Sequence, residues 1–509
     1  MVQSDILKAL SLKSRRWIWL LGIVLILWVA YPVIRVGVFF ICDPIPKDRT
    51  ITLSKTLIND ASGLNETTHS GIIQLPADIN QSITLLRKTL NQANLKNKRI
   101  IPLGARHSMG KQCIGRGAIH IDLSKLKEIK MESGLLHVQA GARWKEVLQF
   151  LAPLGLSVEV MQSNADFSIG GTLSVNAHGW QPDRPPVSST VEKITLMNAN
   201  GELLTCSRSE NKQIFKHALG GYGLFGIILE AWIRPVPNEI LRSNHQIVTC
   251  ENFNSQWNKI KEGPIRLAFG RLSVAPETFF KQVLLTSYQT TGEISKLPAE
   301  YALTPKTSLA RAIFRASLNS ARGKSFRQWM ENLIGGEAGG THSRANLLIE
   351  PVRIFTNNDK DKTDILVEIF VPQEKFADFI SLAREVMRNQ SDSLLNVTIR
   401  EISQDEDSAL PYAKKDMFGL VMLFTIDRNE EAEKALLPSV SGLIDLALNH
   451  GGTFYLPYRN YANSKQTLQA YPELENFIFL KKKADPKEIF VSDFYAYLVQ
   501  TVNQINPKP

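Results

Sequence analysis

The stretch GARHSMGKQ (residues 104–112) stands between two strand-like apolar runs, RIIPL at 99–103 and GAIHIDL at 117–123. A tight connection between strands needs glycine, because glycine adopts backbone conformations that other residues avoid. This loop also carries polar side chains that a plain connection does not need. Converging backbone N–H groups bind anions, and here Arg106 adds a charge and Ser108 a hydroxyl donor. The loop therefore predicts a site for a phosphate group, with an unliganded loop as the alternative.

The loop lacks the signatures of two common nucleotide-binding motifs. A Walker A loop requires Ser or Thr after its Gly-Lys pair, whereas Gln112 follows Gly110 and Lys111. The dinucleotide pattern GxGxxG is also missing, and no acidic residue closes a second strand at the expected distance.

Strand and helix patterns alternate around this loop. GIIQLP at 71–76 is typical of a short strand, and residues 78–97 have apolar residues at helical spacing with Asp78 as the expected N-cap. RIIPL adds a second strand, which completes a βαβ unit. Two further glycine-rich segments follow, SIGGTLSVNAHG at 168–179 and GGYGLFGII at 220–228, and NANGE at 198–202 predicts a hairpin turn.

The chain is long enough for two or three domains. It has 509 residues, of which 44% are hydrophobic and 21% charged, as is ordinary for a folded protein. After residue 238 the pattern changes to longer segments typical of an α+β domain, such as the strand DILVEIFVP at 364–372 and the helix EKFADFISLAREVMRN at 374–389. Residues 451–509 are aromatic and loop-rich, so we expect them to pack back onto another domain.

The N-terminus has the pattern of a membrane anchor. Residues 17–34 are uncharged, and the apolar character extends to residue 42, which is close to the roughly 20 residues needed to span a bilayer. Basic residues before the run predict a cytoplasmic N-terminus, with the rest of the chain on the outer, periplasmic or lumenal side. A cleaved signal peptide is the alternative, although no clean cleavage site follows the run.

The net charge of +10 is concentrated in two places, the N-terminus and residues 301–330. Because no nucleic-acid module is present, membrane phosphates are the simpler partner for both clusters. Residues 306–334 interleave basic and apolar side chains, which is typical of a segment lying on a membrane, or else of a solvated excursion of the second domain. The four cysteines show no metal-binding spacing, and no metal site is expected.

The order and spacing of the three glycine-rich loops resemble the FAD-binding domain of the vanillyl-alcohol oxidase superfamily, the PCMH-type domain. The C-terminal LKKKADPKEIFVSDFYAYL at 480–498 is similar to the ends of the aldonolactone oxidases and decaprenylphosphoryl ribose oxidases. The resemblance implies an α+β fold: a PCMH-type FAD-binding domain of two α/β subdomains, then an α+β substrate domain. The expected organisation is a basic N-terminus at 1–16, an anchor at 17–42, a linker at 43–69, the FAD domain at 70–238, the substrate domain at 239–450 and a C-terminal segment at 451–509.

The resemblance also implies which residues contact FAD. They come from all three loops: Gly104, Ala105, Arg106, His107, Ser108, Met109, Gly110, Gln112, Ile169, Gly170, Gly171, Ser174, Asn176, His178, Gly179, Gly226, Ile227 and Ile228. His107 matches the position where some members attach the flavin covalently, since a neutral imidazole is a good nucleophile. The alternative is a His107 that only forms hydrogen bonds within the loop. For the isoleucines the alternative is ordinary core packing.

On the substrate side the chain departs from the pattern of its relatives. Sugar-oxidising members carry a lysine at the position of Tyr458, where a cation stabilises the reduced flavin. Arg459 is the neighbouring cation, so we take Tyr458, Arg459 and His178 as candidate catalytic residues. His178 either faces the flavin or braces its loop. Tyr455, Tyr458 and Tyr461 either line an apolar pocket or pack in the core.

The expected function is a membrane-anchored, FAD-dependent oxidoreductase. It would pass a hydride from a substrate C–H, in an alcohol, a sugar or a lipid-linked alcohol, to the flavin N5 atom. Two alternatives remain: a flavin-dependent reductase of a membrane lipid, similar to sterol reductases, and a non-catalytic, membrane-tethered interaction protein. The sequence does not identify the electron acceptor.

Overall fold

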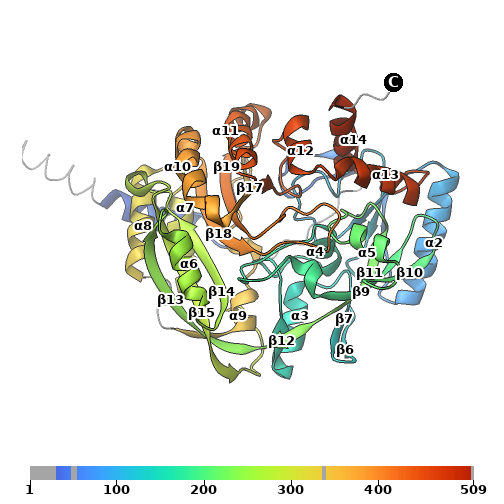
Figure 1. The fold of residues 1–509 in the computed structure, drawn as a ribbon, viewed down its shortest axis with the longest axis horizontal. Coiled ribbons are helices and arrows are strands. Elements are labelled where there is room, and N and C mark those ends of the chain that lie inside the picture. The colour runs from blue at the N-terminus through green and yellow to red at the C-terminus, as the bar shows by residue number, and fades with distance from the viewer. Residues whose placement is uncertain (1–29, 47–53, 55, 335–339, 506–509) are drawn as a thin grey trace, which may run out of the picture.

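The computed structural model describes residues 30–46, 54, 56–334 and 340–505. Two regions lie side by side in Figure 1, an N-terminal α/β region and a large antiparallel sheet. Helix α2 (Ile79–Leu95) lies at one end of the molecule, and α7 (Pro305–Ala316) and α8 (Ala321–Ile334) lie at the other.

The N-terminal region contains two main sheets. The first is parallel, with the order β3 (Gly71–Gln74), β5 (Ile119–Asp122) and β4 (Ile100–Leu103). Helix α2 connects β3 to β4, which confirms the predicted βαβ unit. The helix begins where expected, because the Asp78 carboxylate accepts the backbone N–H of Gln81 at 2.8 Å.

The second sheet is antiparallel and has five strands. Their order is β10 (Leu203–Ser207), β9 (Val191–Met197), β11 (Ile227–Ile233), β7 (Leu135–Gln139) and β6 (Ile129–Glu132). The predicted hairpin turn joins β9 to β10, and Gly201 adopts a φ of +78° there. The second glycine-rich segment forms a short helix, α4 (Ile169–Ser174), which packs against this sheet.

The eight-stranded sheet is antiparallel throughout. Its order is β16 (Thr341–Ser343), β13 (Glu239–Thr249), β15 (Gln282–Ile294), β14 (Ile265–Leu272), β18 (Leu394–Ile402), β19 (Met417–Asp427), β17 (Lys362–Pro372) and β20 (Thr453–Phe454). Helices α6 (Phe253–Lys261), α10 (Phe376–Met387) and α11 (Glu430–Asn449) pack on it around a core of fully buried phenylalanines. The opposite face of β17 meets the N-terminal region, so successive side chains of this strand alternate between the core and the interface.

The C-terminal segment returns to the N-terminal region. It contains α12 (Ser464–Ala470), α13 (Leu474–Ala484) and α14 (Asp493–Ile505). Just before α14, the carbonyl oxygen of Ile489 accepts the N–H of Ile100 at 2.7 Å, and the N–H of Asp493 donates to the oxygen of Ile114 at 2.7 Å. The tail therefore pairs along the free edge of β4, directly before the loop at 104–112.

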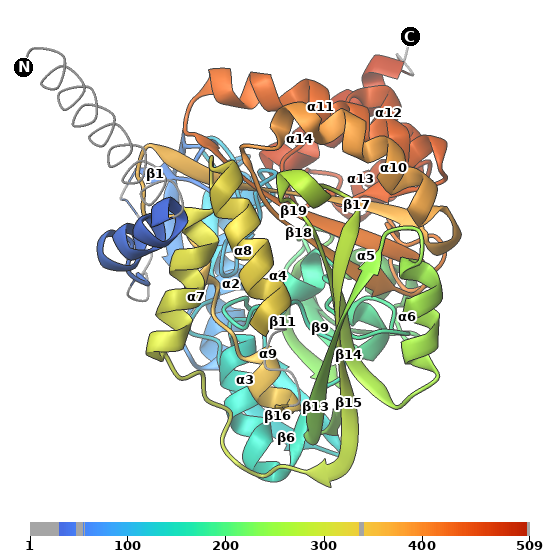
Figure 2. The same cartoon turned by 90° about the vertical axis from the view of Figure 1, so that its left-hand side faces the viewer.

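The predicted anchor at 17–42 lies only partly within the described residues. Residues 17–29 are outside them, and residues 30–42 form a helix against α7 and α8 (Figure 2). Among the residues that the structure describes, no helix is both long and apolar enough to cross a bilayer.

The interpretation of residues 306–334 as a basic membrane segment is wrong in one respect. Four of its cations are buried, with exposures of 1–4%: Arg311, Arg315, Lys324 and Arg327. They bind partners inside the protein, such as the carboxylate of Asp364 for Arg315 and three backbone carbonyls for Lys324. These four cations therefore hold α7 and α8 to the protein and do not contribute to a charged surface. The alternative of a solvated excursion is wrong for the same reason.

A candidate cofactor-binding site

One cavity runs between the three glycine-rich loops and the eight-stranded sheet. It has an empty volume of about 1160 Å³, counting the part that opens to solvent. Its lining comes from the glycine-rich loops on one side and from β17, β18 and the segment after β20 on the other.

The loop after β4 is fixed at one end and open at the other. The N–H groups of Met109 and Gly110 donate to the oxygen of Pro457, and the Gln112 amide donates to the oxygen of Leu456 at 2.9 Å. By contrast, the N–H groups of Arg106, His107 and Ser108 have no partner within the described part of the chain, and these residues line the cavity. Three neighbouring free donors beside a guanidinium suit an anion such as a pyrophosphate.

Small residues let the backbone approach the cavity. A Cβ on Gly104 would lie 2.4 Å from the Ser168 hydroxyl, and one on Gly170 would lie 2.9 Å from the Cβ of Ala140. The Ser168 hydroxyl also accepts the N–H of Ala105 at 3.1 Å, which joins the first two loops directly. These contacts form a closely packed wall against which a flat ligand can lie.

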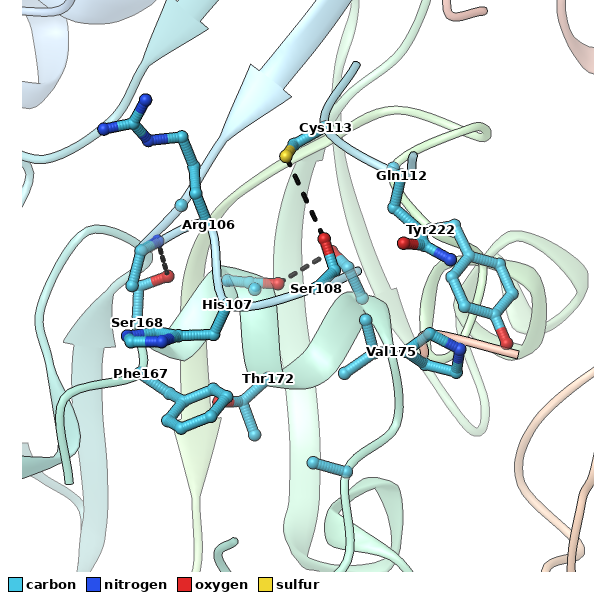
Figure 3. A pocket seen from close by; sticks show the side chains of 18 of the residues that line it. Arg106, His107, Ser108, Gln112, Cys113, Phe167, Ser168, Thr172, Val175 and Tyr222 are labelled. Carbon is cyan, nitrogen blue, oxygen red and sulfur yellow. Dashed lines mark hydrogen bonds between the residues drawn. The ribbon is translucent and has the colours of Figure 1, made fainter. Parts of the chain in front are cut away.

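His107 lies at the cavity beside Phe167 (Figure 3). The two rings stack with centroids 4.2 Å apart. Burial lowers the pKa of His107 to about 4, and the charges of Arg143 and Arg106 act in the same direction. The imidazole is therefore neutral at pH 7, the state that a nucleophilic histidine needs.

The opposite wall comes from the eight-stranded sheet and the segment after β20. Glu368 of β17, Arg400 of β18, Tyr455 and Tyr458 line it. The Glu368 carboxylate lies 2.6 Å from Nε2 of His178, and both side chains are buried. The contact joins the second glycine-rich segment to the eight-stranded sheet.

Arg400 is a cation without a counter-ion. Within the described residues, its guanidinium makes no hydrogen bond or ion pair, and its Nε is buried. It lies near the phenol of Tyr458, whose pKa is raised by burial and by Glu368 while Arg400 opposes the shift. Tyr458 therefore keeps its proton at neutral pH, which makes it a hydrogen-bond donor and a poor base.

Most of the predicted site residues line this cavity. They are Gly104, Ala105, Arg106, His107, Ser108, Gln112, Gly170, Gly171, Ser174, His178, Gly226, Ile227, Ile228 and Tyr458.

Six predicted residues do not line the cavity. Met109 and Gly110 lie in the fixed half of the first loop, while Ile169 and Gly179 pack inside the protein. The amide of Asn176 binds the carboxylate of Asp405 at 2.9 Å.

Arg459 is the sixth. Its guanidinium binds Glu433 and the side chain of Asn65, so it is not the free cation that the sequence suggested.

The sequence interpretation missed several residues that line the cavity. Phe167, Ser168 and Tyr222 lie in or next to the glycine-rich segments, and Glu368 and Arg400 lie on the facing sheet. For Glu368 and Arg400 a signal existed. Glu368 interrupts the apolar run LVEIFV, and Arg400 continues the strand-like alternation of NVTI. A charge within a buried strand needs a partner or a function.

Comparison with known proteins agrees with this geometry. Residues 79–207 match the FAD binding domain family. The chain is 29% identical over 192 residues to the D-arabinono-1,4-lactone oxidase of Saccharomyces cerevisiae, and 31% identical over 185 residues to that of Yarrowia lipolytica. The first match covers 36% of this chain and 36% of the relative, and the second covers 35% of each. The similarity therefore spans about a third of the length of these relatives. Residues 79–207 are therefore similar to the FAD binding domain family, and the cofactor is FAD.

Proposed function

We propose that this protein is a membrane-anchored, FAD-dependent oxidoreductase that oxidises a CH–OH group of a sugar-like or lipid-linked substrate. The supporting observation is the meeting of two sets of residues in one cavity. The glycine-rich loops supply anion-binding donors and the imidazole of His178. The facing sheet supplies the carboxylate of Glu368 and the guanidinium of Arg400, which has no partner among the described residues. The similarity to lactone oxidases supports a sugar-like substrate.

FAD, when bound, supplies the hydride acceptor. The chain's own residues supply position and charge. The free N–H groups of residues 106–108, with Arg106, hold the anionic part of the cofactor. Arg400 offers a positive charge at the other wall, for an oxygen that becomes negative during the reaction.

Glu368 is the best candidate for the base. Oxidation of a CH–OH group releases the hydroxyl proton, which a carboxylate can accept. Glu368 lines the cavity and lies against Nε2 of His178, so the proton can be shared between the two side chains. Tyr458 holds its own proton and instead donates a hydrogen bond to an oxygen of the substrate.

We also propose His107 as the point of covalent attachment to FAD. Its low pKa and its place at the cavity suit a neutral nucleophile. The test is the visible spectrum of purified protein before and after acid precipitation. Flavin colour in the pellet of the wild type, but in the supernatant for His107→Ala, supports attachment; colour released from both contradicts it.

The same preparation separates the classes of function. Rapid bleaching of the flavin by aldonolactones or polyols supports the oxidation proposed here. Bleaching by NADPH alone favours a reductase instead. Flavin that none of these compounds reduces, or no flavin after reconstitution, favours an interaction protein.

We further propose that the apolar run at 17–42 anchors the chain, with the N-terminus in the cytoplasm and the cavity on the outer side. The basic residues before this run support the orientation. Protease added outside sealed, right-side-out vesicles should then digest the body of the protein; protection of the body would reverse the orientation.

A further inference from the structure

The outer surface of three packed helices is unusually apolar. In helix 30–42, Val33, Ile34, Val38 and Ile41 are 52–78% exposed, and in α8 Trp329 and Leu333 are 56% and 66% exposed. Helix 30–42 and α7 touch through a small buried cluster of Val36, Ala312 and Ala316, against which Phe326 of α8 packs. The three helices lie side by side in Figure 2, and we call their exposed surface the apolar face.

Helix 30–42 is fastened firmly to the protein. The Arg35 guanidinium donates to the oxygens of Ala316 and Leu318 at 2.7 and 2.8 Å. In return, the buried Arg311 of α7 binds the carboxylate of Asp43 at 2.8 Å, just after the helix. Removing one partner of a partly buried ion pair lowers the stability of the protein much more than removing one partner of an exposed pair. These contacts therefore fix the orientation of the helix relative to the rest of the protein, and the same side of the helix stays exposed.

The charges of these helices are arranged so that the apolar face carries no anion. The acidic residue of α8, Glu331, is held by Arg327 at 2.7 Å and Arg271 at 2.8 Å. α7 and the helix at 30–42 contain no acidic residue. The exposed charges are basic, as in Arg322, whose guanidinium lies 5.8 Å from the ring of Tyr31. Aromatic and basic residues around an apolar surface are typical of the boundary between lipid and water.

We propose that the apolar face is seated in the surface layer of a lipid bilayer, so that the body of the protein is held against the membrane instead of on a free tether. The occupant is lipid because the sequence that enters the helix at residue 30 is an uncharged apolar run from residue 17. The basic rim complements the phosphates of an anionic bilayer. This proposal rests on the anchoring proposed above and adds which surface of the protein meets the lipid.

Contact of the apolar face with lipid would also set the position of the cavity relative to the bilayer. Arg315 of α7 binds Asp364 of β17 at 3.0 Å, and Glu368 lines the cavity four residues further along the same strand. Four residues of strand span about 13 Å. The base proposed for the reaction is thus one short length of strand from a helix of the apolar face, which places the cavity within reach of a substrate held in the membrane.

The test places a fluorescent label on the apolar face of the full-length protein. The background carries Cys42→Ser, because Cys42 is the exposed cysteine and the other three are buried. Leu333→Cys takes an environment-sensitive label, and Trp329→Cys is the second site. Leu95→Cys, 87% exposed on α2 at the opposite end of the molecule, is the matched control. The proteins are reconstituted in vesicles of phosphatidylcholine and phosphatidylglycerol.

Labels at 333 and 329 should shift to the blue, lose quenching by aqueous iodide and gain quenching by spin-labelled lipid, while the label at 95 does none of these. Iodide quenching equal to that at 95 would overturn the proposal. So would protection from iodide without quenching by lipid, which would show a second copy of the chain on this face. Vesicle flotation of the same samples reports the anchoring separately, and the flavin absorbance reports the cofactor site. Failure of the seating is therefore distinguishable from failure of the proposed function.

Discussion

The imidazole of His178 and the carboxylate of Glu368 meet at 2.6 Å where the N-terminal region contacts the eight-stranded sheet. The other ring nitrogen of His178, Nδ1, lies 3.2 Å from the oxygen of Gly179. Both ring nitrogens of His178 therefore lie within hydrogen-bond distance of an oxygen, one in its own loop and one on β17. The pair thus joins the second glycine-rich segment to β17 at the wall of the cavity.

The first prediction concerns Glu368 as the base. Glu368→Gln keeps the shape of the side chain but removes the carboxylate, so kcat should fall by roughly 10²–10⁴-fold, the usual contribution of general base catalysis. Flavin content should stay unchanged. The measurement is steady-state turnover across a pH range. Glu374→Gln, at an exposed position, is the control. If Glu368→Gln keeps full turnover and the wild-type pH profile, Glu368 is not the base.

The second prediction concerns Arg400. A cation beside the cofactor favours its reduced, anionic form, so Arg400→Met should lower the reduction potential of the bound flavin. Arg400→Lys should restore part of the shift, because it keeps the charge but loses the planar guanidinium. A redox titration by absorbance measures this. Arg388→Met, whose side chain is 67% exposed, is the control. A potential equal in Arg400→Met and the wild type would remove Arg400 from the site.

The third prediction tests the closely packed wall. The added Cβ of Gly170→Ala would meet the Cβ of Ala140 at 2.9 Å and its carbonyl oxygen at 3.3 Å, so α4 or the turn after β7 must shift. Such overpacking typically costs about 1–3 kcal/mol, and flavin retention should fall with it. Gly442→Ala in α11 is the matched control, since its Cβ meets only Val386 at an ordinary 3.4 Å. Thermal unfolding and the flavin-to-protein absorbance ratio provide the measurements; equal loss in both variants would refute the argument.

Local patterns predicted the elements whose contacts are local. The helix after Asp78 and the turn at Gly201 follow from capping and turn chemistry that a short segment contains in full. The first loop could also be predicted from the sequence, because its glycines and polar side chains are neighbours in the chain.

The remainder of the site depends on contacts between distant segments. His178 and Glu368 are 190 residues apart, and no local pattern indicates that they meet. The same limit explains Arg459, whose partner Glu433 comes from a separate helix, and the buried cations of α7 and α8, whose partners lie on β17, β18 and the loops beside them. A basic, apolar helix has the same sequence pattern whether its cations face lipid or interior carbonyls.

The last prediction concerns stability in acid. His120 of β5 is fully buried, and burial lowers its pKa from 6.5 to about 4, with the charge of the neighbouring His69 acting in the same direction. Above pH 6.5 the residue is neutral in both the folded and the unfolded chain. Between pH 6.5 and 4 only the unfolded chain binds the proton, so the free energy of unfolding falls as the pH falls.

The difference in pKa sets the size of this effect at about 2 kcal/mol by pH 5, and it stops growing below pH 4, where the folded state binds the proton too. His120→Leu removes the titrating group and should reduce the loss of stability between pH 7 and pH 5 by that amount. Denaturant unfolding of both proteins at the two pH values measures it. If the wild type and His120→Leu lose the same free energy of unfolding between pH 7 and pH 5, His120 binds its proton in the folded state. The ring would then have access to water in spite of its burial.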